Sequence, residues 1–85
     1  MAYQIKIKKS AEKELKDLPL SAVIRIREKV FELAFNPFPQ NVKKLKGFTN
    51  LYRIRIGNYR AVYSIEYQDK IIEILKIGDR KNIYD

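Results

Sequence analysis

The residues best suited to chemistry in this chain are cations that gather in one acid-free stretch. No Asp or Glu lies between Glu32 and Glu66. The cations of that stretch are Lys43, Lys44, Lys46, Arg53, Arg55 and Arg60. They account for most of the formal net charge of +8, because the other twelve basic residues face ten acidic ones. Segregated positive charge attracts polyanions, so we expect nucleic acid as the partner class.

The residue types that are missing also limit the chemistry. The chain has no cysteine and no histidine. This excludes a disulfide framework and thiolate metal sites, and it removes the commonest acid-base side chain. We therefore expect no metal and no cofactor, and any reaction must use Arg, Lys, Tyr or carboxylates. A guanidinium group is planar and always charged, and its forked donors match phosphate oxygens.

A predicted hairpin positions three of the arginines. Gly57 and Asn58 favour a two-residue turn, which pairs position 56 with 59, 55 with 60 and 53 with 62. Arg53, Arg55 and Arg60 then share one face, and apolar residues take the other. Like charges directly opposite destabilise a sheet by up to roughly 1 kcal/mol, so the Arg55 and Arg60 pair favours an anion site. The alternative is that solvated arginines only protect a sheet edge.

Other candidate residues lie on either side of this hairpin. A second turn at Gln68 and Asp69 would place Arg60 opposite Ile77 and bring Arg80 to the same edge. Lys43, Lys44 and Lys46 are expected in a loop before the hairpin, either solvated or extending the positive track along an RNA strand. Tyr84 could pack, fray or stack on a base.

The remaining elements are predicted from periodicity and capping. Positions 3–8 alternate apolar and polar residues, as in a half-buried strand. Ser10 is expected to cap a helix that Pro19 ends. A second helix follows from near Ser21 to about Phe35.

The second helix carries two apolar stripes. The first is Val23, Ile26, Val30 and Leu33; the second is Leu20, Ile24, Phe31 and Phe35. One stripe can cover the sheet. We expect the first helix to cover the other, and a partner protein is the alternative.

These elements predict an α+β fold in the order β-α-α-β-β-β. An N-terminal strand and a helical hairpin precede a three-stranded antiparallel meander, and the helices pack on one face of the sheet. Residues 1–85 are expected to form a single domain. No apolar run is long enough to cross a membrane and none indicates a signal peptide, so a cytoplasmic location is expected.

Three runs of residues carry a resemblance to a known family. They are residues 44–47, 51–63 and 77–84. With the opening strand and the break at Leu18 and Pro19, they resemble the RelE family of toxins from toxin-antitoxin modules over nearly the whole chain. The sister ParE branch, which poisons gyrase, shares the fold and usually differs in the first hairpin strand and the chain end.

The resemblance implies an endoribonuclease that cleaves messenger RNA in the ribosomal decoding site and so inhibits translation. In the family the RNA 2′-hydroxyl attacks the adjacent phosphate without a metal, giving a cyclic phosphate and a free 5′-hydroxyl. The family's catalytic positions correspond here to Arg53, Arg55, Arg60, Arg80 and Tyr84. The resemblance also implies a cognate antitoxin that wraps around the toxin in a hetero-oligomer.

The acid-base step is the least defined part of this expectation. Arginine stays protonated, so another group must activate the 2′-hydroxyl. Some relatives carry lysines at the positions of Arg53 and Arg55, and many carry a histidine at that of Asp79. The candidates here are Lys46, Asp79 and Tyr84, and the ribosome can supply part of the rate. Two alternatives stay open: a gyrase-inhibiting toxin of the ParE type, and an inactive member that only binds RNA or antitoxin.

Overall fold

The structure, a computed structural model, describes residues 2–79 of the chain. The elements in this range are β1 (Gln4–Ile7), α1 (Lys9–Lys16), α2 (Leu20–Leu33), β2 (Val42–Lys44), β3 (Leu51–Ile56), β4 (Tyr59–Glu66) and β5 (Ile71–Asp79). The predicted α+β class and the order of strand, two helices and hairpins are confirmed, with one short strand added.

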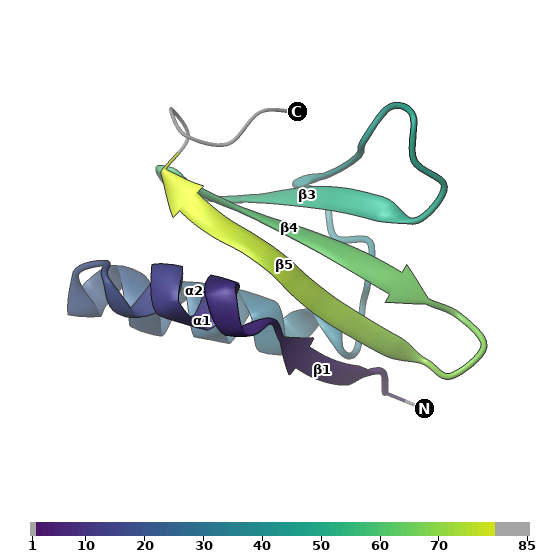
Figure 1. Cartoon of the computed structure of the whole chain (residues 1–85), viewed down its shortest axis with the longest axis horizontal. Helices are drawn as coiled ribbons and strands as arrows, with labels where there is room; N and C mark the ends of the chain where they lie inside the picture. Colours follow the sequence, from purple (N-terminus) through teal and green to yellow (C-terminus); the bar gives the residue numbers. More distant parts are fainter. Residues whose placement is uncertain (1, 80–85) are drawn as a thin grey trace.

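The strands form one sheet in the order β1-β5-β4-β3-β2. β1 runs parallel to β5, and the other neighbouring strands are antiparallel. Both helices lie on the same side of β3, β4 and β5, as Figure 1 shows. The prediction that the helices cover one face is therefore confirmed, and within residues 2–79 no helix covers the other face.

The added strand is β2, where the sequence predicted only loop. Val42 pairs with Ile54, Lys43 with Arg53 and Lys44 with Tyr52. Three residues are too few to show a period of two, so the tertiary pairing with β3 decides this conformation. The prediction that Lys43 and Lys44 lie in a loop was wrong.

The β3–β4 hairpin has the predicted register. Ile56 pairs with Tyr59, Arg55 with Arg60 and Arg53 with Val62. Gly57 has a φ of +61°, which fits the first central position of a type II′ turn, where glycine avoids a steric penalty. The turn therefore determines which side chains of β3 and β4 share a face of the sheet.

The β4–β5 hairpin keeps the predicted register only halfway. Glu66 pairs with Ile71 and Tyr63 with Ile74, as expected, but a bulge between Val62 and Tyr63 then shifts the pairing. Val62 pairs with Lys76, which leaves Leu75 as the extra residue of β5. The predicted pairing of Arg60 with Ile77 was wrong, because Arg60 pairs with Gly78.

The core lies between the helices and the covered face of the sheet. Its largest fully buried side chains are Leu15, Ile26, Leu33, Tyr63, Ile65, Ile72 and Ile74. They come from both helices and from β4 and β5, so the first apolar stripe of α2 packs on the sheet as predicted.

The second stripe of α2 is not covered by α1. Its residues, Leu20, Ile24, Phe31 and Phe35, are 53 to 74% exposed. Phe31 and Phe35 contact each other edge to face, with ring centroids 5.5 Å apart. The expected cover by the first helix was wrong, because α1 packs chiefly over β5.

The helix boundaries differ slightly from those predicted. α1 begins at Lys9, so Ser10 lies in its first turn and does not cap it. Pro19 is the cap residue of α2, and its carbonyl accepts the N–H groups of Ala22 and Val23 at 2.9 and 3.0 Å. Neither helix described within residues 2–79 is long and apolar enough to cross a membrane.

Candidate nucleic-acid interface

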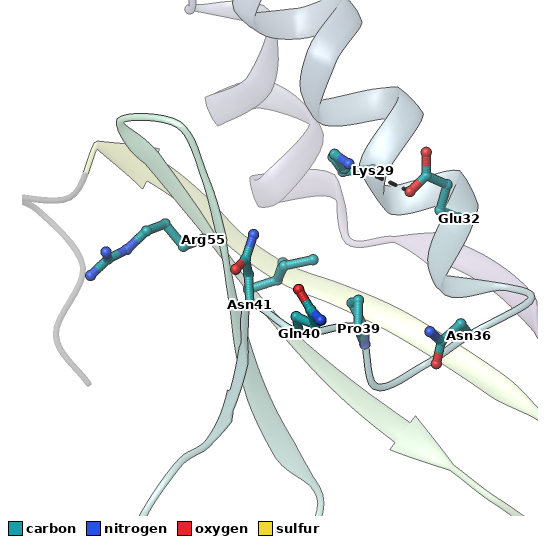
Figure 2. Close-up of a pocket in the computed structure, with 8 residues that line it drawn as sticks. Lys29, Glu32, Asn36, Pro39, Gln40, Asn41 and Arg55 are labelled. Atoms are coloured by element: carbon teal, nitrogen blue, oxygen red, sulfur yellow. Dashed lines mark ion pairs between the residues drawn. The ribbon is translucent and has the colours of Figure 1, made fainter.

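The open face of the sheet carries the three hairpin arginines. Strand alternation and the observed register put Arg53, Arg55 and Arg60 on the side opposite the helices, and we call these three residues the arginine face. Arg55 lies directly across from Arg60, as predicted. Arg55 extends from β3 away from the helices (Figure 2).

The three arginines differ in exposure. Arg53 is only 7% exposed, Arg60 is partly buried and Arg55 is exposed. The neighbour of Arg53 on β4 is Val62, which packs with Leu45 and Leu51 in a small apolar cluster. Burial among such neighbours strengthens electrostatic interactions, because the local dielectric constant is lower than that of water.

The electrostatics of Arg53 show that the arginines act on one another. Burial, and then the positive charges of Arg60 and Arg55, lower the pKa of Arg53 below its ordinary value. Its guanidinium is delocalised and carries its positive charge in proteins. A bound anion would relieve the repulsion among the three charges.

The lysines before the hairpin divide between two sides of the sheet. Lys43 pairs with Arg53 and belongs to the open face, whereas Lys44 pairs with Tyr52 and belongs to the side of the helices. Lys46 is exposed in the turn between β2 and β3. Of the three predicted RNA-binding lysines, the pairing thus brings Lys43 to the arginine face and leaves Lys44 off it.

The end of β5 approaches the arginine face beside Arg60. The residue of β5 that pairs with Arg60 is Gly78, which adds no side chain to that face. Asp79 is partly buried and pairs with Tyr59, so alternation puts it on the side of the helices. The predicted site residues Arg80 and Tyr84 lie outside the described residues.

Two hollows flank the edge of the arginine face, and the sequence did not indicate them. A hollow of about 350 Å³ lies between α2, the loop that follows it and β3 (Figure 2). A second, of about 250 Å³, lies on the side of Lys43 and Arg53. Gln40, Asn41 and Arg55 line both. No sequence signal separates these amides from ordinary loop residues, because their role depends on β2 pairing with β3.

Comparison with known proteins places this architecture in a family. The profile of the family described as "ParE toxin of type II toxin-antitoxin system, parDE" matches residues 5–84. Two proteins of Methanocaldococcus jannaschii are similar along most of their length. RelE1 is 39% identical over 99% of this chain and 97% of its own, and toxin RelE3 is 37% identical over 91% and 90%.

A solved structure agrees with these sequence matches. The RelE chain of the archaeal RelE-RelB complex from Pyrococcus horikoshii is 39% identical to this chain, with a TM-score of 0.85. The match covers 98% of this chain and 100% of that one. The family profile, the identities and the shared fold together establish that this chain belongs to the RelE/ParE family of type II toxin-antitoxin toxins.

Proposed function

We propose that this chain is the toxin of a toxin-antitoxin pair and that it cleaves messenger RNA on the ribosome at the arginine face. The observation that carries the proposal is the gathering of Arg53, Arg55 and Arg60 on one open face, with the pKa of Arg53 lowered by burial and by the other two. Its relatives named RelE1 and toxin RelE3 support the RelE type of activity.

The proposed reaction is a metal-independent transesterification. The 2′-oxygen attacks the adjacent phosphorus, the bond to the 5′-oxygen breaks, and the products are a 2′,3′-cyclic phosphate and a 5′-hydroxyl. Negative charge builds on the equatorial phosphate oxygens, where preorganised cations commonly contribute several kcal/mol. Arg60 and Arg80 are proposed to stabilise this negative charge. Arg53 and Arg55 are proposed to hold the substrate in line for attack.

Three residues are candidates for the proton transfers of this reaction. Lys46 is exposed in the turn between β2 and β3 and is the first candidate. Asp79 and Tyr84 remain the other candidates for the acid-base step. The ribosome is expected to orient the message, so cleavage of free RNA should be weak or absent.

Primer extension of a message on translating ribosomes tests the cleavage. We expect cuts between codon positions with the wild-type protein and none with the Arg60→Ala, Arg80→Ala double variant. Intact message in both cases, together with tight ribosome binding, would instead support a module that binds RNA without cutting it.

A gyrase-directed activity is the second candidate, because the matching family profile carries the ParE name. The same double variant distinguishes the two. Growth arrest that persists in the variant, accompanied by gyrase-linked DNA breaks, would support the ParE type of activity and reject cleavage of messenger RNA.

We further propose that a cognate antitoxin covers the exposed stripe of α2 and reaches the arginine face with acidic residues. The RelE of Pyrococcus horikoshii was solved with RelB, and a contiguous row of exposed apolar side chains is typical of an interaction surface. Co-expression with a neighbouring small reading frame should restore growth and raise solubility.

The stripe itself can be tested by charge insertion. An Ile24→Lys, Phe31→Lys double variant should lose the rescue, whereas Lys13→Gln on exposed α1 surface should keep it. Rescue that is equally strong in the stripe variant would show that the antitoxin binds elsewhere.

A further inference from the structure

The larger hollow beside β3 has the composition of a polar recognition site. Three carboxamides, those of Asn36, Gln40 and Asn41, line it together with Lys29, Glu32, Pro39, Ile54 and Arg55. In Figure 2 Gln40 and Asn41 lie on the loop side, and the Lys29–Glu32 pair lies on the helix side. Its volume of about 350 Å³ is at the lower end of the range of roughly 300–1,000 Å³ that small-ligand sites occupy.

The three carboxamides have different tasks. The Oδ1 atom of Asn36 accepts a hydrogen bond from the backbone N–H of Phe38 at 3.1 Å, which shapes the loop after α2. Gln40 and Asn41 are exposed. A carboxamide presents a hydrogen-bond acceptor beside two donors, so Gln40 and Asn41 can offer a paired donor and acceptor to a ligand.

A backbone hydrogen bond fixes the loop that carries these two residues to β3. The backbone N–H of Arg55 donates to the carbonyl oxygen of Asn41 at 3.3 Å, one residue before β2 starts. Arg55, Gln40 and Asn41 also line the smaller hollow, which contains Lys43 and Arg53. Gln40 and Asn41 thus lie at the sheet edge, between the larger hollow on the helix side and the open face toward which the Arg55 side chain points (Figure 2). An RNA strand that crosses this edge can keep a phosphate at Arg55 and turn a base into the hollow.

We propose that the larger hollow binds a nucleobase of the single RNA strand whose phosphates lie on the arginine face, and that Gln40 and Asn41 recognise its edge. The inference rests on the proposed function and adds the substrate's base to it. Sequence-specific proteins read single-stranded RNA through unstacked bases. Asn and Gln pair in bidentate fashion with N6 and N7 of adenine, so adenine is expected to bind best.

The charged pair on the helix side suits the same ligand. The Nζ atom of Lys29 lies 3.6 Å from Oε1 of Glu32, and both side chains are exposed to solvent. The carboxylate of Glu32 can accept a hydrogen bond from an exocyclic amino group, and Lys29 reduces the repulsion between that carboxylate and a nearby phosphate. A nucleobase with an amino group is thus favoured over uracil, which has none.

The test measures equilibrium binding of the full chain to oligoadenylate and to an abasic ribose-phosphate oligomer of the same length. Both probes carry the same phosphates, so any difference in affinity reports the base. We expect the wild-type protein to prefer oligoadenylate by about tenfold, because one bidentate pair discriminates by roughly five- to 150-fold. The Gln40→Ala, Asn41→Ala variant should bind both probes alike, at the wild-type affinity for the abasic one.

The matched control removes the same two residue types elsewhere. Asn50 and Gln68 are exposed and line a separate hollow, formed by the loop before β3 and the β4–β5 turn. The Asn50→Ala, Gln68→Ala variant should keep the tenfold preference. Oligouridylate should bind the wild-type protein less tightly than oligoadenylate does, and this difference should disappear in the Gln40→Ala, Asn41→Ala variant.

The outcomes separate this inference from the proposed function. Salt-sensitive binding of both probes with equal affinity, or a preference that survives in the Gln40→Ala, Asn41→Ala variant, would overturn the base site and leave the arginine face as an RNA-binding surface. Failure to bind either probe at low salt would overturn both proposals.

Discussion

The two faces of the central hairpin use the same strands for opposite purposes. On the covered face, Ile54, Ala61 and Ile77 pair in one row and are almost completely buried. On the open face, the next row places Arg55 opposite Arg60. One row gains free energy from burial, whereas the other places like charges side by side.

This difference indicates that residues for stability and residues for function alternate along the same strands. A slip by one position would put arginines into the core and isoleucines into solvent, so the apolar row holds the charged row in place. The turn at Gly57 thus determines both the core and the arginine face. Substitutions on the two faces should therefore have effects of different kinds.

The largest expected effect is on the covered face. Ile77→Ala should lower the free energy of unfolding by about 2–5 kcal/mol, because it leaves a cavity where the side chain is 2% exposed. Urea denaturation measures the change. RNA binding by the remaining folded protein should be unchanged, and a selective loss of binding would show that the two faces are not separable.

A comparable effect on catalysis is expected on the open face. Arg60→Gln should reduce ribosome-dependent cleavage by roughly 10²- to 10³-fold, since it removes a cation aimed at the transition-state charge. The measurement is the single-turnover rate with saturating toxin. Lys13→Gln on α1 removes the same charge away from this face and should leave the rate unchanged.

A smaller effect, of opposite sign for stability, is expected at Arg55. Arg55→Thr should raise the free energy of unfolding by a few tenths to about 1 kcal/mol, because it removes the like-charge pair with Arg60. The same change should weaken RNA binding and reduce its salt dependence by about one phosphate contact. A destabilised Arg55→Thr protein would contradict the view that this pair is maintained for an anion.

The tyrosines should make the stability of the protein depend on pH in the alkaline range. Burial raises the pKa of Tyr63, and a hydrogen bond between the hydroxyls of Tyr52 and Tyr67, 3.1 Å apart, raises the pKa of Tyr67 to about 12. The folded state therefore favours the neutral phenols. Their contribution to the free energy of unfolding is complete below a pH of about 10, the ordinary pKa of tyrosine, and the contribution of Tyr67 is lost as the pH rises toward 12. Thermal denaturation across this range should show falling stability, and Tyr52→Phe should reduce the part that belongs to Tyr67.

Much of the central hairpin could be predicted because its turn is local. Gly57 and Asn58 specify the β3–β4 pairing, and the alternation then sorts Arg53 and Ile54 to opposite faces. The bulge at Leu75 has a signal in the sequence. Ile72 and Ile74 face the core, as does Ile77, and this change of parity between positions 74 and 77 marks an extra residue.

Other features depend on contacts that no local pattern encodes. β2 is a three-residue edge strand whose conformation comes from pairing with β3, so the separation of Lys43 from Lys44 was not predictable. The hollow beside Gln40 arises from the same pairing. The exposed stripe of α2 was misassigned because periodicity identifies an apolar face without showing what covers it.

The most direct test of the central claim is cleavage of a message on translating ribosomes by two variants of equal net charge. Arg53→Gln, Arg60→Gln removes two cations from the arginine face, and Lys13→Gln, Lys16→Gln removes two from α1. Primer extension should show wild-type cuts with the α1 variant and none with the arginine variant, although both remain folded. Cuts of equal intensity in both variants would contradict this claim.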